Sequence, residues 1–130
     1  GHVAAQSQLG SMYYGGFGVI QDFKKAFHWC SEAASQGDRQ AQYTLGLMYD
    51  HGEGVKIDYS QAFQWYKKAA EQGYSCAQKN VGYMYHLGKG VEQDDQQAFE
   101  WTKLGAKGGC EYAQYNLGIA YEMGQGIPID

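Results

Sequence analysis

A repeat of 36 residues is the feature that most constrains how this chain can fold. The recurrence is clearest at four alanines: Ala5, Ala41, Ala77 and Ala113. A glycine keeps the same interval at Gly10, Gly46, Gly82 and Gly118, and a tyrosine keeps it at Tyr13, Tyr49, Tyr85 and Tyr121. Periods of 20–50 residues are typical of solenoids, in which each unit buries its apolar side against its neighbours.

Each unit is predicted to hold two helices joined by a glycine-rich turn. In the second unit the apolar residues of the first helix are Ala41, Leu45, Met48 and Tyr49. Their spacing of i, i+4, i+7 and i+8 places them on one stripe of an α-helix. A second helical stretch, YSQAFQWYKKAAEQ, follows the turn HGEGV. The chain is therefore predicted to be an all-α solenoid.

Glycines and aspartates mark the expected helix boundaries. In each turn the first of two glycines is expected to end the first helix in a left-handed conformation, and the second to allow another sharp turn. Four aspartates recur after the turns: Asp22, Asp58, Asp94 and Asp130. An aspartate at the start of a helix caps free N–H groups and suits the positive end of the helix dipole.

A further glycine lies inside each first helix, where it costs about 1 kcal/mol relative to alanine. A glycine accepted at this position in every unit indicates that another side chain presses against the helix backbone. We expect the pressing side chains to be the recurring tryptophans of the second helices, Trp29, Trp65 and Trp101. Their helical spacing beside alanine and phenylalanine also predicts that they belong to the core.

The period divides the chain into one domain of repeats, residues 5–130. The predicted units are residues 5–40, 41–76 and 77–112, followed by a partial unit, 113–130. Residues 1–4 are expected to be a tag remnant or linker. The first helix of the partial unit has an apolar stripe without a second helix after it, and natural solenoids cap their ends with polar faces. We therefore expect either further residues that cover this stripe or self-association through this C-terminal end.

Composition excludes several classes of function. The net charge is −4 and no run of lysines or arginines occurs, so a nucleic-acid partner is not expected. No apolar stretch reaches about 18 residues, so membrane insertion is not expected either. The cysteines, Cys30, Cys76 and Cys110, are odd in number, which favours three free thiols. Cys76 and Cys110 are the one pair whose geometry could allow a disulfide.

No catalytic or metal-binding pattern is found. The stretch LGKGV at 87–91 lacks the serine or threonine of a phosphate-binding loop and follows a predicted helix rather than a strand. The four histidines show no zinc-ligand spacing. No pairing of a nucleophile with a base is evident. The chain is therefore predicted not to be an enzyme and to need no cofactor or metal.

The repeating pattern, A-x-x-x-L-G-x-x-Y-x-x-G-x-G-V-x-x-D-x-x-x-A-F-x-W-x-x-x-A-A-x-x-G, closely resembles the Sel1-like repeat, a relative of the tetratricopeptide repeat. The resemblance runs from Ala5 to Asp130. It implies a right-handed superhelix of antiparallel helix pairs whose first helices line the concave face. It also implies an adaptor or scaffold, a bacterial source and, as a weaker indication, export from the cell. Some relatives carry a disulfide within each repeat, a pattern from which this sequence departs.

Specificity is expected at positions that do not repeat, because the repeated positions build the scaffold. We use the name first-helix face for ten such residues on the first helices. They are Tyr43, Leu47, Asp50, Lys79, Tyr83, His86, Leu87, Tyr115, Ile119 and Glu122. Tyrosine and apolar residues exposed together are typical of partner surfaces. Lys79, Asp50, His86 and Glu122 are expected to set the partner's register through charge. Alternatively, some of these side chains pack between adjacent first helices.

Two classes of function follow from the sequence. The first is a non-catalytic scaffold or adaptor that binds a peptide or a partner protein along the concave face. The alternative is an accessory or regulatory repeat domain of a larger protein, either enzymatic or secreted and host-interacting.

Overall fold

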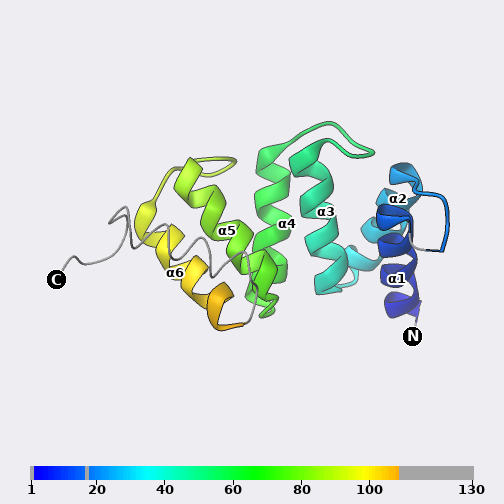
Figure 1. Cartoon of the computed structure of the whole chain (residues 1–130), viewed down its shortest axis with the longest axis horizontal. Coiled ribbons are helices and arrows are strands. Elements are labelled where there is room, and N and C mark those ends of the chain that lie inside the picture. The colour runs from blue at the N-terminus through cyan, green and yellow to red at the C-terminus, as the bar shows by residue number, and fades with distance from the viewer. Residues whose placement is uncertain (1, 17, 109–130) are drawn as a thin grey trace.

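The computed structural model describes residues 2–16 and 18–108, which form six α-helices and no strand. The helices are α1 (His2–Gly15), α2 (Phe23–Ser35), α3 (Arg39–His51), α4 (Tyr59–Glu71), α5 (Ser75–Leu87) and α6 (Asp95–Lys107). From α2 onward, each helix begins 36 residues before its counterpart in the next repeat. Figure 1 shows the helices in sequential order along the long axis of the molecule. The predicted all-α repeat superhelix is confirmed.

The predicted glycines lie at the C-terminal ends of helices and the predicted aspartates at the N-terminal ends. Gly52 and Gly88 cap α3 and α5 in the left-handed conformation, with φ of 69° and 67°. The carboxylate of Asp58 accepts a hydrogen bond from the backbone N–H of Gln61 at the start of α4. Asp22 and Asp94 cap α2 and α6 in the same way. Glycine is required at the C-caps because other residues adopt a positive φ at a steric cost.

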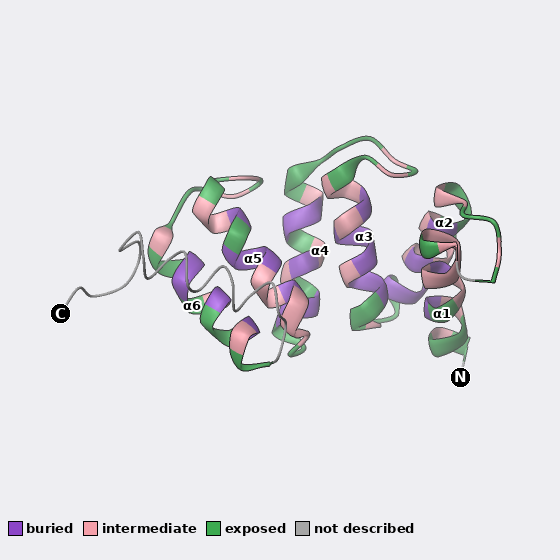
Figure 2. Cartoon of the chain, viewed as in Figure 1, coloured by how far each residue is buried: buried purple, intermediate pink, exposed green. Residues whose placement is uncertain are grey.

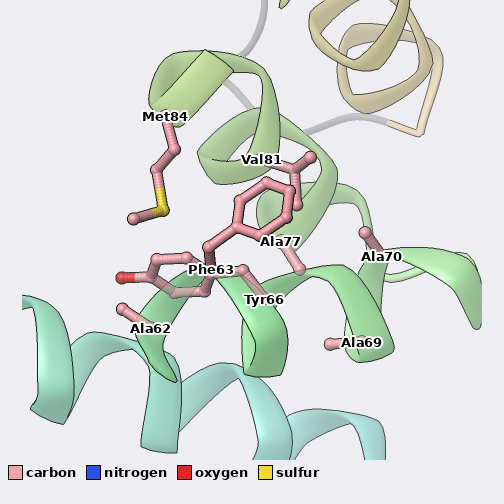
Figure 3. Close-up of a cluster of buried hydrophobic side chains, with 8 residues drawn as sticks. All are labelled: Ala62, Phe63, Tyr66, Ala69, Ala70, Ala77, Val81 and Met84. Atoms are coloured by element: carbon pink, nitrogen blue, oxygen red, sulfur yellow. The ribbon is translucent and has the colours of Figure 1, made fainter. Parts of the chain in front are cut away.

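The core consists of one buried cluster at each junction between repeats. The first cluster joins α2 to α3 and contains Ala26, Cys30, Ala33, Ala34, Ala41, Leu45 and Met48. The second joins α4 to α5 and contains Ala62, Phe63, Tyr66, Ala69, Ala70, Ala77, Val81 and Met84. Figure 3 shows the side chains of the second cluster on these two helices. The apolar stripes of α3 and α5 are therefore buried by the second helix of the preceding repeat.

The prediction that tryptophans press on the helix glycines is wrong. The side chain that follows each tryptophan does so instead. The space beside Gly46 that a Cβ atom would need is filled by the Tyr66 ring, and Cys30 and Thr102 fill the corresponding space beside Gly10 and Gly82. The close approach inferred from the glycines is present, but it is made by a different residue of the second helix.

The tryptophans lie at the edge of the core, where all three are half-buried. Trp65 packs against the α2–α3 cluster and Trp101 against the α4–α5 cluster. Each of these two rings therefore packs against the cluster at the junction between its own repeat and the preceding one. The prediction that they belong to the core holds only for part of each side chain.

The second glycine of each turn has a role beyond its positive φ. A Cβ atom on Gly54 would lie 2.6 Å from the carbonyl oxygen of Phe23, at the start of α2. Gly90 approaches the carbonyl of Tyr59, at the start of α4, in the same way. Each turn therefore rests against the preceding repeat, so a larger residue there would disturb repeat stacking as well as the turn itself.

The cysteines differ from one another. Cys30 is free and fully buried, and burial raises the pKa of its thiol to about 12, which makes it unreactive at neutral pH. Cys76 is disulfide-bonded, so the prediction of three free thiols is wrong. Cys110 lies outside the described residues, as does the expected partial repeat with its self-associating end. None of the described helices is long and apolar enough to cross a membrane.

Substituting Gly46 with alanine tests the close approach of α4 to α3. The added methyl group would overlap the Tyr66 ring, so Gly46→Ala is expected to lower the free energy of unfolding by about 1–3 kcal/mol. Urea denaturation measures this change. Gln64→Ala, at an exposed position of α4, is the control and is expected to change stability by less than about 0.5 kcal/mol. Equal stability of the Gly46→Ala variant and the parent would contradict the account.

Candidate partner-binding surface

The described residues of the first-helix face come from α3 and α5 and differ widely in exposure. Tyr83 and Leu87 on α5 are the most exposed, at 48% and 49%. They are four residues apart, so they lie on the same side of the helix. Lys79 and His86 are half-buried. Tyr115, Ile119 and Glu122 lie outside the described residues.

Tyr43 and Leu47 on α3 are half-buried and pack against the α4–α5 cluster. The Tyr43 ring centroid lies 5.8 Å from that of Tyr66 and 5.1 Å from that of Tyr74. Both ring contacts lie within the unit 41–76, so the Tyr43 ring packs against the second helix of its own repeat and the link that leads into α5.

Asp50 sits at the centre of a polar network within the face. Its Oδ2 atom accepts a hydrogen bond of 3.1 Å from the Tyr66 hydroxyl. Its Oδ1 atom lies 3.0 Å from the Lys89 ammonium, an ion pair that lacks the direction of a hydrogen bond. The same ammonium lies 4.4 Å from the centre of the Tyr59 ring. The Asp50 carboxylate therefore links its own repeat to the turn of the next one.

A corresponding link joins the first two repeats. The Tyr14 hydroxyl donates a hydrogen bond of 2.6 Å to the Glu53 carboxylate. Tyr14 and Asp50 occupy equivalent positions, as do Glu53 and Lys89. The two linked pairs, Tyr14–Glu53 and Asp50–Lys89, are therefore both separated by 39 residues. Sequence reasoning missed these links, because the residue types differ between repeats. The only sequence signal for these links was that the two linked positions hold polar residues that can pair with each other across each junction.

Electrostatics keep the phenols of this network protonated. Burial, reinforced by the nearby Asp50 carboxylate, raises the pKa of Tyr66, and burial together with Glu53 raises that of Tyr14. Both hydroxyls therefore remain hydrogen-bond donors at neutral pH. Burial lowers the pKa of Lys79, while the Asp50 carboxylate opposes that shift.

The histidines of this surface also face carboxylates. His86 Nδ1 lies 3.0 Å from Asp95 Oδ1, which also accepts a hydrogen bond from Gln93. His51 Nδ1 lies 3.6 Å from Glu53. The charges expected to set a partner's register at Asp50 and His86 are therefore already engaged within the chain. No group of three or more metal-ligating side chains occurs among the described residues.

Comparison with known proteins agrees with the repeat pattern. The Sel1 repeat family matches residues 3–38, 39–74, 77–110 and 111–130, and the chain belongs to this family. Members of this family are typically non-catalytic scaffolds that mediate protein–protein interactions. The search of curated proteins gave no match.

Several solved structures are similar to this chain. One is a protective antigen present in uropathogenic Escherichia coli strains, with an SLR fold, at 44% identity and a TM-score of 0.90 over 98% of this chain. Another is a Sel1 repeat protein from Oxalobacter formigenes, at 35% identity and a TM-score of 0.88, also over 98%. This chain spans only 27% and 53% of those two proteins. The cysteine rich protein B of Helicobacter pylori is similar over 89% of both chains, at 26% identity and a TM-score of 0.75.

Two substitutions of Asp50 separate its hydrogen bond from its ion pair. Asp50→Ala would leave the buried Tyr66 hydroxyl without an acceptor, which is expected to cost about 1–3 kcal/mol of stability. Asp50→Asn keeps an acceptor for that hydroxyl and loses only the ion pair with Lys89, so a smaller cost of about 1 kcal/mol is expected. Urea denaturation of both variants measures whether Asp50→Ala loses more stability than Asp50→Asn. Equal losses would show that the hydrogen bond is not the stabilising contact.

Proposed function

We propose that this chain is a non-catalytic interaction scaffold that binds a peptide or a partner protein along the concave face formed by its first helices. Residues 5–130 would act as one repeat domain in that role. The observation that carries the proposal is the pair Tyr83 and Leu87, two large apolar side chains left about half exposed on one side of α5. Exposed apolar side chains that gather in this way are typical of interaction sites.

The neighbouring side chains support an apolar binding mode. Tyr43 and Leu47 of the preceding repeat lie partly exposed and pack against the α4–α5 cluster, so they would add apolar area to the same surface. The acidic and imidazole groups beside them are held by partners within the chain, so few unpaired charges oppose desolvation of the surface. A partner would therefore gain most of its binding free energy from burying tyrosine and leucine side chains.

The arrangement of the helices supports a concave face that is lined by the first helices. Besides its contacts with α2, α1 contacts α3 directly, so the first helices of the first two repeats approach each other. A superhelix brings its inner helices together and spreads its outer helices apart. An extended peptide or a partner's helix lying across α3 and α5 would then reach side chains from successive repeats.

A second candidate function, an accessory or regulatory domain, is supported by the length of the similar proteins. This chain spans 27% and 53% of two of them, so it would also suit an accessory or regulatory domain of a larger protein. The disulfide at Cys76 and the likeness to a protective antigen favour an exported bacterial protein. The domain content of the full-length gene product distinguishes the two candidates, because further repeats favour the scaffold and an unrelated domain favours the accessory role.

A peptide library displayed on phage and selected on the immobilised protein tests the binding surface. The selected peptides are measured against three forms of the protein, namely the parent, the double variant Tyr83→Ser, Leu87→Ser, and Leu104→Ser. Affinity for the double variant is expected to fall at least tenfold, because an anchor residue at an interface contributes about 2 kcal/mol or more. Fluorescence anisotropy gives the dissociation constants, and circular dichroism confirms that each variant is helical.

Leu104→Ser serves as the matched control. Leu104 is 46% exposed, similar to Tyr83 and Leu87, but it lies on the second helix α6. Binding to this variant is expected to match the parent. Peptides that bind the double variant normally but lose affinity for Leu104→Ser would place the binding surface on the second helices and overturn the proposal.

A further inference from the structure

Lys79 is a half-buried lysine on the first-helix face. It lies four residues before Tyr83 and eight before Leu87, so the three side chains lie on one side of α5. Figure 2 shows buried, intermediate and exposed residues alternating along this helix. The equivalent positions of the other units hold Ser7, Tyr43 and Tyr115. Only the third unit therefore places a cation at this point of the surface.

The charges around Lys79 compensate its ammonium only in part. Burial lowers the pKa of Lys79, and the Asp50 carboxylate opposes this shift without outweighing it. Asp50 also serves other groups, because its Oδ2 accepts a hydrogen bond from Tyr66 and its Oδ1 lies 3.0 Å from the Lys89 ammonium. One carboxylate is therefore shared between two ammonium groups, which leaves one positive charge in excess.

Two further carboxylates of this surface already have donors of their own. Asp95 faces His86 and accepts a hydrogen bond from Gln93. Glu53 accepts a hydrogen bond from Tyr14. The chain as a whole carries a net charge of −4, so the positive charge at Lys79 is confined to one point and is not part of a general basic surface.

We propose that this point binds an acidic side chain of the partner, an aspartate or a glutamate, whose carboxylate pairs with Lys79 while neighbouring apolar side chains of the partner cover Tyr83 and Leu87. The inference rests on the proposed function, because it names the chemistry of the segment that the first helices would bind. The carboxylate supplies the counter-charge that Asp50 provides only in part. Covering the pair with apolar side chains strengthens it by excluding water.

A single lysine on the stripe also has a consequence for register. Because only one unit carries the cation, one acidic residue suffices to fix how a bound segment is placed along the repeats. Charge complementarity of this kind contributes to specificity more than to affinity, since a segment shifted by one unit would lose the ion pair.

An acidic residue within the segment fits this point better than the carboxylate at a chain terminus. Partly exposed apolar side chains lie on both α3 and α5, at Tyr43 and Leu47 as well as at Tyr83 and Leu87. A segment that ends at Lys79 would reach apolar side chains on one of these helices. A segment that continues past Lys79 can reach both, and so buries more apolar area.

The substitution Lys79→Met tests the proposal, because it keeps a long apolar side chain and removes the charge. Peptides selected on the parent protein from the phage-displayed library are expected to carry an aspartate or a glutamate. Their affinity for Lys79→Met, measured by fluorescence anisotropy, is expected to fall at least tenfold, because a partly buried charge loses its partner. Circular dichroism confirms that the variant is helical.

Lys67→Met is the matched control. Lys67 is also half-buried, but it lies on the second helix α4. The selected peptides are expected to bind this variant as they bind the parent, because the proposed contact is to a first helix.

Changes in the peptide identify the source of the carboxylate. Exchanging its acidic residue for the corresponding amide is expected to weaken binding to the parent by the same factor. The same exchange is expected to have little further effect on binding to Lys79→Met, because the two groups act as a pair. Amidation of the peptide C-terminus is expected to leave binding unchanged.

Three results would overturn the proposal. They are selected peptides without enriched acidic residues, equal affinity of the parent and Lys79→Met for those peptides, and loss of binding on amidation of the C-terminus. Failure of the proposed function looks different, because the double variant Tyr83→Ser, Leu87→Ser would then bind the peptides normally. Weak binding to the double variant together with normal binding to Lys79→Met would retain the surface and reject the acidic residue. A library that yields no binding peptide would contradict both proposals.

Discussion

The contact of a second-helix side chain with a first-helix glycine is the constraint on which each repeat depends. The glycine lets the two helices approach very closely. A side chain of the second helix then fills the place where a Cβ atom of the first helix would be. Three different residues fill this place, namely Cys30, Tyr66 and Thr102. The glycine is therefore the fixed part of the contact, while the opposing side chain varies. Only Tyr66 is long enough to carry a hydroxyl to Asp50, which ties this packing contact to the polar network on the first helices.

Polar links between repeats determine how neighbouring units sit on one another. The Tyr14–Glu53 hydrogen bond and the Asp50–Lys89 ion pair join equivalent positions at successive junctions. Both run from a first helix to the turn of the next repeat, on the same side as Tyr83 and Leu87. Because apolar packing is non-directional, these pairings of specific polar groups help to define the relative rotation of the repeats. The surface offered to a partner is thus shaped by groups that do not themselves need to touch it.

The sequence was sufficient to predict the period, the helix pairs of an all-α solenoid, the left-handed glycine caps and the aspartate N-caps. Each of these depends on local backbone chemistry at a fixed offset. The residue that presses on Gly46 was not predictable in this way, because Trp65 and Tyr66 are neighbours and the choice depends on how α4 is rotated about its axis. The cross-repeat links were missed because their residue types change from one repeat to the next. The disulfide at Cys76 was not predicted, because the odd number of cysteines favoured free thiols.

The central claim is that the first helices form the working surface of this scaffold. The most direct measurement is an NMR titration of the isotope-labelled protein with a peptide selected to bind it. The account predicts that chemical-shift changes concentrate on α3 and α5, around Tyr43, Leu47, Tyr83 and Leu87. Changes that concentrate on α2, α4 and α6, with these four residues unaffected, would contradict it.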